Sequence, residues 1–168
     1  ELICREEFDL AAEIAIAQVS KGAQILDGCV ANSDRDELQD AKQVFETITK
    51  KVRAPLMIDS TDPVVIEASL RRTQGKCIIN SLNFEDGFER CNQVLPLVKK
   101  YGASVVFGTI DEDKNEAMAI TAERKLAIAR RAYNYLVKEC GIKPTDIIFD
   151  TLVFPIATCD AKYMDSAK

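Results

Sequence analysis

The stretch Leu56-Met57-Ile58-Asp59-Ser60-Thr61-Asp62-Pro63 decides the fold of this chain. Its first three residues are apolar, as expected of a strand that is buried on both faces of a parallel sheet. Pro63 suits the first position of a helix, where its missing N–H would be unpaired anyway, and Asp62 is a favourable N-cap. The stretch therefore predicts a strand, a polar turn and a helix, with the Asp59 carboxylate at the carboxyl end of the strand.

The same order of apolar segment, polar residue and helical spacing recurs along the chain. Four more strands are predicted, at residues 23–27, 76–81, 103–111 and 147–150. The predicted helices cover residues 6–21, 33–52, 63–74, 88–101 and 121–140. Ser33 or Asp34 would cap the second of these, Gly75 would close the third, Pro96 would kink or break the fourth, and Thr121 would cap the fifth. The inner face of the fifth would carry Leu126, Ala129, Tyr133, Leu136 and Cys140. Strands that alternate with helices indicate a parallel sheet with right-handed crossovers.

A barrel and an open doubly wound sheet both fit this alternation. The glycine-rich phosphate-binding motifs of open sheets, G-x-G-x-x-G and G-x-x-x-x-G-K-[ST], are absent from the sequence. A polar residue at the carboxyl end of every strand is typical of a (β/α)₈ barrel, which has eight strands. The expected fold class is therefore α/β, a partial (β/α)₈ TIM barrel with about five parallel strands. We expect residues 1–168 to form one such incomplete domain.

The predicted strand ends carry four carboxylates and one amide. They are Asp27, Asp59, Asn80, Asp111 and Asp150. Neighbouring strands of a barrel would bring these side chains around one mouth. Carboxylates accept hydrogen bonds from N–H groups, and an amide both donates and accepts, so the set suits a neutral heterocycle that is rich in donors. Two alternatives stay open, since the oxygens could hold Mg²⁺ or Ca²⁺ and each Asp could only cap the helix that follows it.

The composition excludes several classes of function. The net charge is −5, and 47% hydrophobic with 29% charged residues is the profile of a globular protein. No stretch gathers Lys and Arg with aromatic residues as a nucleic-acid surface would, and no apolar run is long enough to span a bilayer. The chain has no His, which excludes Ser–His and Cys–His nucleophiles and most zinc sites, so no catalytic or metal residue is assigned.

The cysteines and the N-terminus favour a cytoplasmic protein. The charged N-terminus predicts no signal peptide, and no two cysteines form a C-x-x-C pair. The six cysteines are Cys4, Cys29, Cys77, Cys91, Cys140 and Cys159. Scattered cysteines of this kind are typical of reduced thiols in the cytosol, and we expect them to be small buried hydrophobic residues.

Four strings resemble the pterin-binding methyltransferase family, and within it the folate-binding domain of cobalamin-dependent methionine synthase. They are GAQILD at residues 22–27, PLMIDST at 55–61, GKCIINS at 75–81 and DIIFD at 146–150. The likeness runs over residues 6–157. Dihydropteroate synthase is a more distant relative in this resemblance.

The resemblance implies a barrel that binds 5-methyltetrahydrofolate at its carboxyl-end mouth. The methyl group would pass from N5 of the pterin to cob(I)alamin on a partner domain or protein, in methionine synthesis. By motif match, Asp59, Asn80 and Asp150 would hold the pterin ring, and Asp27 and Asp111 would line the same mouth.

The resemblance also implies that the first and the last two strands of the barrel are lacking here, including the strand that supplies a residue near N5. The isolated chain is then expected to be inactive. Two other functions stay open: a dihydropteroate synthase-like enzyme of folate biosynthesis, and a non-catalytic binding or assembly module. Exposed sheet edges would favour a homo-oligomer.

Overall fold

The computed structural model describes residues 1–154, 157, 163 and 166. The chain forms two compact units. The first comprises Glu1–Asn80 with Lys100–Ser104, and the second comprises Ser81–Lys99 with the described part of Val105–Lys168.

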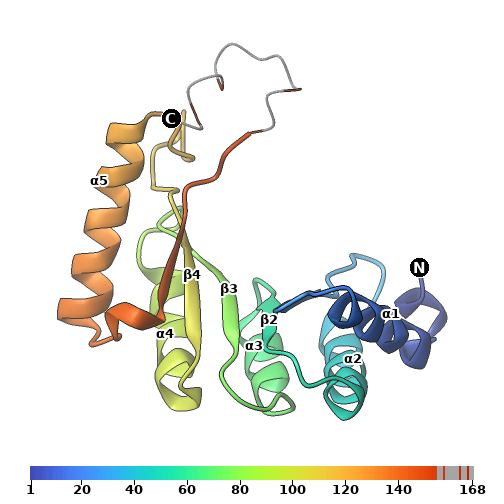
Figure 1. The fold of residues 1–168 in the computed structure, drawn as a ribbon. Coiled ribbons are helices and arrows are strands. Elements are labelled where there is room, and N and C mark those ends of the chain that lie inside the picture. The colour runs from blue at the N-terminus through green and yellow to red at the C-terminus, as the bar shows by residue number, and fades with distance from the viewer. Residues whose placement is uncertain (155–156, 158–162, 164–165, 167–168) are drawn as a thin grey trace. The chain divides into compact units, whose positions relative to one another are not determined.

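In the part of the chain that the structure describes, strands alternate with helices (Figure 1). The strands are β1 (Leu26–Cys29), β2 (Leu56–Asp59), β3 (Ile78–Leu82), β4 (Ser104–Gly108) and β5 (Ile147–Asp150). The α-helices are α1 (Phe8–Ser20), α2 (Glu37–Lys51), α3 (Pro63–Leu70), α4 (Glu89–Tyr101) and α5 (Ala122–Tyr133), which continues into the π-helix η2 (Asn134–Glu139). Short 3₁₀ helices are η1 (Ile3–Arg5) and η3 (Pro144–Asp146).

The strands are parallel, as the sequence predicts. β1 pairs with β2 and β2 with β3 in the first unit, while β4 pairs with β5 in the second. Among the described residues, β1 and β5 each have one neighbouring strand, so the sheet is not closed. The predicted α/β fold and partial barrel are confirmed.

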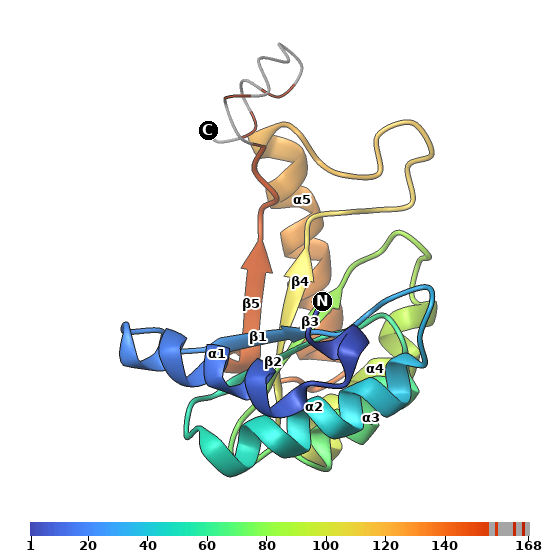
Figure 2. The same cartoon turned by 90° about the vertical axis from the view of Figure 1, so that its right-hand side faces the viewer.

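Close packing over Gly28 joins helix α2 to strand β1 in the first unit. Helices α1, α2 and α3 lie side by side, with α2 in the middle (Figures 1 and 2). Phe45 on α2 is almost fully buried, and a Cβ added to Gly28 would lie 2.9 Å from the Cζ atom of its ring. A strand residue with a side chain would therefore push the ring out of place.

The second unit is built around the buried ring of Phe84. This ring packs edge-to-face against Phe107 at 4.8 Å and against Phe88 at 5.2 Å between ring centroids. The guanidinium group of Arg131 lies over the Phe84 ring at 4.2 Å from its centroid. Figure 2 shows β4 and β5 side by side, with α5 alongside. Aromatic and cation–π contacts thus connect the residues after β3 with β4 and α5.

Two of the predicted helix caps are confirmed, and two are wrong. Asp62 accepts a hydrogen bond from the N–H of Val64 at 2.7 Å, and the Thr121 hydroxyl accepts one from the N–H of Arg124 at 3.3 Å. The N-cap of α2 is Asp36, not Ser33 or Asp34. The reason is a turn that Asn32 organises, because its side chain already accepts the N–H of Asp34 at 3.0 Å.

Gly75 does not close α3. That helix ends at Leu70 with Arg71 as its C-cap, and Gly75 lies in the turn beyond it with a φ of +76°. The glycine is needed there for its left-handed backbone, so its role is in the turn before β3.

Pro96 does not break α4, which runs from Glu89 to Tyr101 with Pro96 inside. A proline removes one backbone hydrogen bond and crowds the preceding turn. The opposite face of the helix offsets this cost, because its apolar side chains are fully buried while Pro96 is exposed. These side chains are Cys91, Val94, Leu95 and Val98.

The buried face of α5 is displaced from the predicted one. Leu126 is 50% exposed and Tyr133 is 40% exposed. The buried residues are Lys125, Ile128, Ala132 and, as predicted, Leu136. This stripe is hard to recognise in the sequence because it includes the charged residue Lys125. In the structure, the Lys125 ammonium group donates a hydrogen bond to the carbonyl of Ser166.

The cysteine prediction is right in part. Cys77 and Cys91 are buried, and burial raises the pKa of both thiols, that of Cys91 to about 11. Cys4 and Cys29 are exposed instead, and Cys140 is half-buried. Cys159 lies outside the described residues.

Replacing Gly28 with Ala is expected to lower the free energy of unfolding by about 1–3 kcal/mol, because the new methyl group meets the Phe45 ring. Urea denaturation followed by circular dichroism measures the change. In a Phe45→Leu background the shorter side chain leaves room, so the same substitution should cost less. Equal costs in the two backgrounds would contradict this account of the packing.

Candidate functional site

Strand register places the side chains at the ends of β1, β2 and β3 in one row. Asp59 at the end of β2 pairs with Cys29 on one side and with Asn80 on the other. Paired residues of neighbouring parallel strands point to the same face of the sheet, at strand spacings of about 4.8 Å. The first unit therefore brings Asp59 and Asn80 together, as the sequence predicts.

Asp27 lies within β1 rather than at its end, because the strand continues through Gly28 to Cys29. It is two residues before Cys29 and so shares the face of that residue. Burial of its carboxyl raises the pKa of Asp27, and the nearby charge of Asp59 raises it further. Asp27 and Asp59 are thus electrostatically coupled, although Asp27 pairs with Met57 in the sheet.

The turn after β2 is fixed by side chains other than Asp59. The buried Ser60 donates a hydrogen bond to the carboxylate of Glu37 at 2.6 Å, and its hydroxyl accepts one from the N–H of Asp62 at 3.2 Å. Asp62 is the N-cap of α3. The capping alternative therefore does not apply to Asp59.

Strand β5 ends at Asp150, which pairs with Gly108 of β4 in the second unit. The Asp150 carboxylate accepts a hydrogen bond from the N–H of Leu152 at 2.8 Å. Leu152 has a φ of +49°, a left-handed conformation that costs a residue with a side chain about 1–2 kcal/mol. Next to Gly108, the hydroxyl of Thr109 is fully buried and has no hydrogen-bond partner among the described residues.

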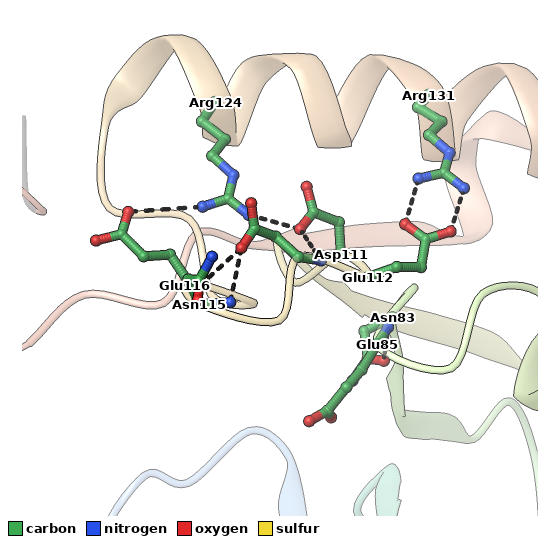
Figure 3. Close-up of polar contacts among 9 residues, drawn as sticks. Asn83, Glu85, Asp111, Glu112, Asn115, Glu116, Arg124 and Arg131 are labelled. Carbon is green, nitrogen blue, oxygen red and sulfur yellow. Dashed lines mark hydrogen bonds and ion pairs between the residues drawn. The ribbon is translucent and has the colours of Figure 1, made fainter.

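Asp111 lies beyond β4 and is paired with an arginine. Its carboxylate accepts a hydrogen bond from the guanidinium of Arg124 at 2.6 Å (Figure 3). The N-cap of α5 is Thr121, so Asp111 does not cap the helix that follows it either.

A second arginine of α5 holds the residue next to Asp111. Arg131 donates two hydrogen bonds to the carboxylate of Glu112, at 2.6 and 2.7 Å, and these bonds lower the pKa of Glu112 to about 2 (Figure 3). Because Arg131 also lies over the Phe84 ring, this pair connects the residues after β4 to the core of the second unit.

The five predicted residues are thus divided between the two units. Asp27, Asp59 and Asn80 gather in the first, and Asp111 and Asp150 belong to the second. Two residues were not predicted from the sequence: Cys29, which completes the row at the strand ends, and Arg124. Arg124 could have been predicted as an ion-pair partner, because it lies in the first turn of α5, after a loop rich in carboxylates.

Neither a metal cluster nor a membrane-spanning helix is found in the part of the chain that the structure describes. Within it, no three His, Cys, Asp or Glu side chains are arranged to hold a metal ion. None of the helices there has the length and apolar character that crossing a membrane requires.

Residues 1–164 match the family model described as pterin binding enzyme. The chain belongs to this family. Methionine synthase from Mycobacterium tuberculosis (strain ATCC 25618 / H37Rv) is 38% identical over 161 residues, and methionine synthase from Mycobacterium leprae (strain TN) is 35% identical over 161 residues. Each match covers 94% of this chain but 13% of the relative, so the chain spans a small part of these proteins.

Solved structures of dihydropteroate synthases share the fold. The enzyme from Xanthomonas albilineans with 4-aminobenzoic acid has a TM-score of 0.65 at 20% identity, covering 89% of this chain and 54% of that one. The enzyme from Coxiella burnetii in complex with pteroic acid has a TM-score of 0.65 at 21% identity, covering 88% and 55%. The partial barrel of this chain is therefore similar to about half of a dihydropteroate synthase.

Replacing Asp27 with Asn is expected to stabilise the chain at pH 7. The raised pKa means that the folded chain disfavours the ionised carboxyl, so Asp27 costs stability above its folded pKa and costs none below its unfolded pKa near 3.8. The advantage of Asp27→Asn should therefore shrink as the pH falls from 7 toward 4. Urea denaturation at several pH values measures it, with the exposed loop variant Asp34→Asn as control. A destabilised Asp27→Asn variant at pH 7 would contradict the prediction.

Proposed function

We propose that this chain binds the pterin ring of 5-methyltetrahydrofolate for methyl transfer to cob(I)alamin in methionine synthesis. The observation that carries the proposal is the pairing of Asp59 with Asn80 at the carboxyl ends of β2 and β3. Carboxyl ends of parallel strands are where α/β barrels bind ligands. Asp59 is not used as a helix cap, because Asp62 caps α3.

The chemistry of these residues suits the ring. A carboxylate accepts hydrogen bonds from the N–H groups of an amino-pyrimidinone edge, and the Asn80 amide can both donate to the ring and accept from it. We assign Asp150 to the same ring, with Asp27 and Asp111 as further lining residues. The residues of the chain would bind and orient the folate, since a methyl transfer gains most from correct placement of its two partners.

The relatives favour methyl transfer over the dihydropteroate synthase reaction. Methionine synthases are 35–38% identical to this chain, whereas the dihydropteroate synthases are 18–21% identical and support the fold alone. The methyl acceptor, cob(I)alamin, would come from a partner domain or protein and takes the methyl group from N5 of the folate.

Replacing Asp59 with Asn is expected to weaken binding of 5-methyltetrahydrofolate about 10- to 100-fold, because a hydrogen bond to a charged group contributes about 1.5–3 kcal/mol. Isothermal titration calorimetry measures the affinity, and circular dichroism checks the fold. Asp62→Asn is the matched control: it removes a charge three residues away, while Asn still caps α3. Unfolding of the Asp59→Asn variant would show that Asp59 has a structural role instead.

The unaltered chain provides the decisive test. Titration with 5-methyltetrahydrofolate at millimolar concentration should release or absorb measurable heat, and its absence would overturn the proposed function. Incubation with free cob(I)alamin then distinguishes an enzyme from a binding module, because only an enzyme would form methylcobalamin faster than the uncatalysed reaction.

A further inference from the structure

Cys29, at the end of β1, is the third member of the row that contains Asp59 and Asn80. It pairs with Asp59 in the register of β1 and β2, and Asp59 pairs with Asn80 in the register of β2 and β3. Neighbouring strands of a sheet are about 4.8 Å apart, so Cys29 and Asn80 flank Asp59 on its two sides. All three residues belong to the first unit.

The packing of Gly28 shows which face of the sheet Cys29 occupies. A Cβ atom on Gly28 would meet the ring of Phe45, so this position of β1 faces helix α2. Successive residues of a strand point to opposite faces, and Cys29 therefore points away from α2. Strand β2 alternates in the same way, because Ile58 is 1% exposed whereas Asp59 is half-buried. Cys29 and Asp59 thus share the face of the sheet opposite to the helix.

The Cys29 side chain is available to a ligand at this place. It is exposed, and no hydrogen bond of its thiol is found among the described residues. Free cysteine behaves as a small hydrophobic residue with a weak S–H donor, which suits contact with an aromatic ring. A bicyclic ring is wider than the strand spacing of about 4.8 Å, so a ring bound at Asp59 also covers a neighbouring position of the row.

We propose that Cys29 is a further contact residue of the pterin site, and that its thiol packs against the folate that Asp59 binds. This inference rests on the proposed function. Asn80 supplies hydrogen bonds on one side of Asp59, and Cys29 supplies an apolar contact of small size on the other. The bound folate then covers the thiol, and a longer side chain at this position would occupy the space of the ring.

Alkylation of the thiols tests this contact. The thiolate sulfur attacks the methylene carbon of iodoacetamide and displaces iodide, and mass spectrometry of the peptides gives the rate at each cysteine. With 5-methyltetrahydrofolate at about ten times its Kd, about one chain in eleven is unbound, so the rate at Cys29 should fall about 10-fold. Cys140 is the control. It is half-buried and precedes β5, away from the carboxyl end of that strand, so its rate should not change.

Replacing Cys29 with Leu should raise the Kd for 5-methyltetrahydrofolate about 10-fold, equal to about 1.4 kcal/mol, because the longer side chain takes the space of the ring. Cys29→Ala leaves this space open and is the matched control, with a much smaller expected change in affinity. Isothermal titration calorimetry measures both affinities. Thermal denaturation checks that each variant is folded, as expected for substitutions at an exposed position.

The outcomes separate the two proposals. If the unaltered chain binds no folate, the proposed function fails and this inference with it. If the chain binds folate while Cys29 is alkylated at an unchanged rate, only the contact of Cys29 is overturned. An equal fall in rate at Cys29 and Cys140 would also overturn it, since the ligand would then act through the stability of the whole chain. A Cys29→Leu variant with the affinity of the unaltered chain would do the same.

Discussion

The parallel pairing of β1, β2 and β3 is the constraint on which the rest of the candidate site depends. Hydrogen bonds between these strands fix Cys29, Asp59 and Asn80 in one row. Side chains alternate between the two faces of a strand, so a shift by one residue would turn Asp59 to the other face. Buried apolar residues prevent this shift. It would move Leu56 and Ile58 out of the core and put Met57 and Asp59 in their place. The core thereby determines where the polar side chains lie.

In the second unit, helix α5 has the corresponding role. Arg124 and Arg131 are seven residues apart, which is close to two helical turns, so both project from the same side. One binds Asp111 and the other Glu112, while Ile128 and Ala132 of the same helix are buried. A single helix therefore packs into the core and also fixes two neighbouring residues of the loop after β4.

The sequence predicted what depends on local chemistry. Asp62 and Thr121 are caps because of the residues beside them, and the parallel strands follow from the repeated alternation with helices. Predictions failed where tertiary contacts decide. The end of β1 could not be placed, because Gly28 looks like a turn residue until Phe45 is seen packed against it. The buried stripe of α5 includes Lys125, whose partner Ser166 is 41 residues further along the chain. Of the candidate site, the pairing of Asp59 with Asn80 was predictable, and the arginine held against Asp111 was not.

Unfavourable local features occur within β1 and just beyond the ends of β4 and β5. Asp27 has a carboxyl whose pKa is raised by burial, Leu152 has a left-handed backbone, and Thr109 has a buried hydroxyl without a described partner. Each lowers the stability of the folded chain relative to a residue suited to its surroundings. Such costs are typical of sites where the residue type is set by a ligand rather than by packing. The fold alone does not specify a reaction, since barrels of this kind carry many activities. The case for a ligand therefore rests on particular residues: the carboxylate of Asp59 beside the amide of Asn80, on a sheet whose register leaves both side chains at its carboxyl end.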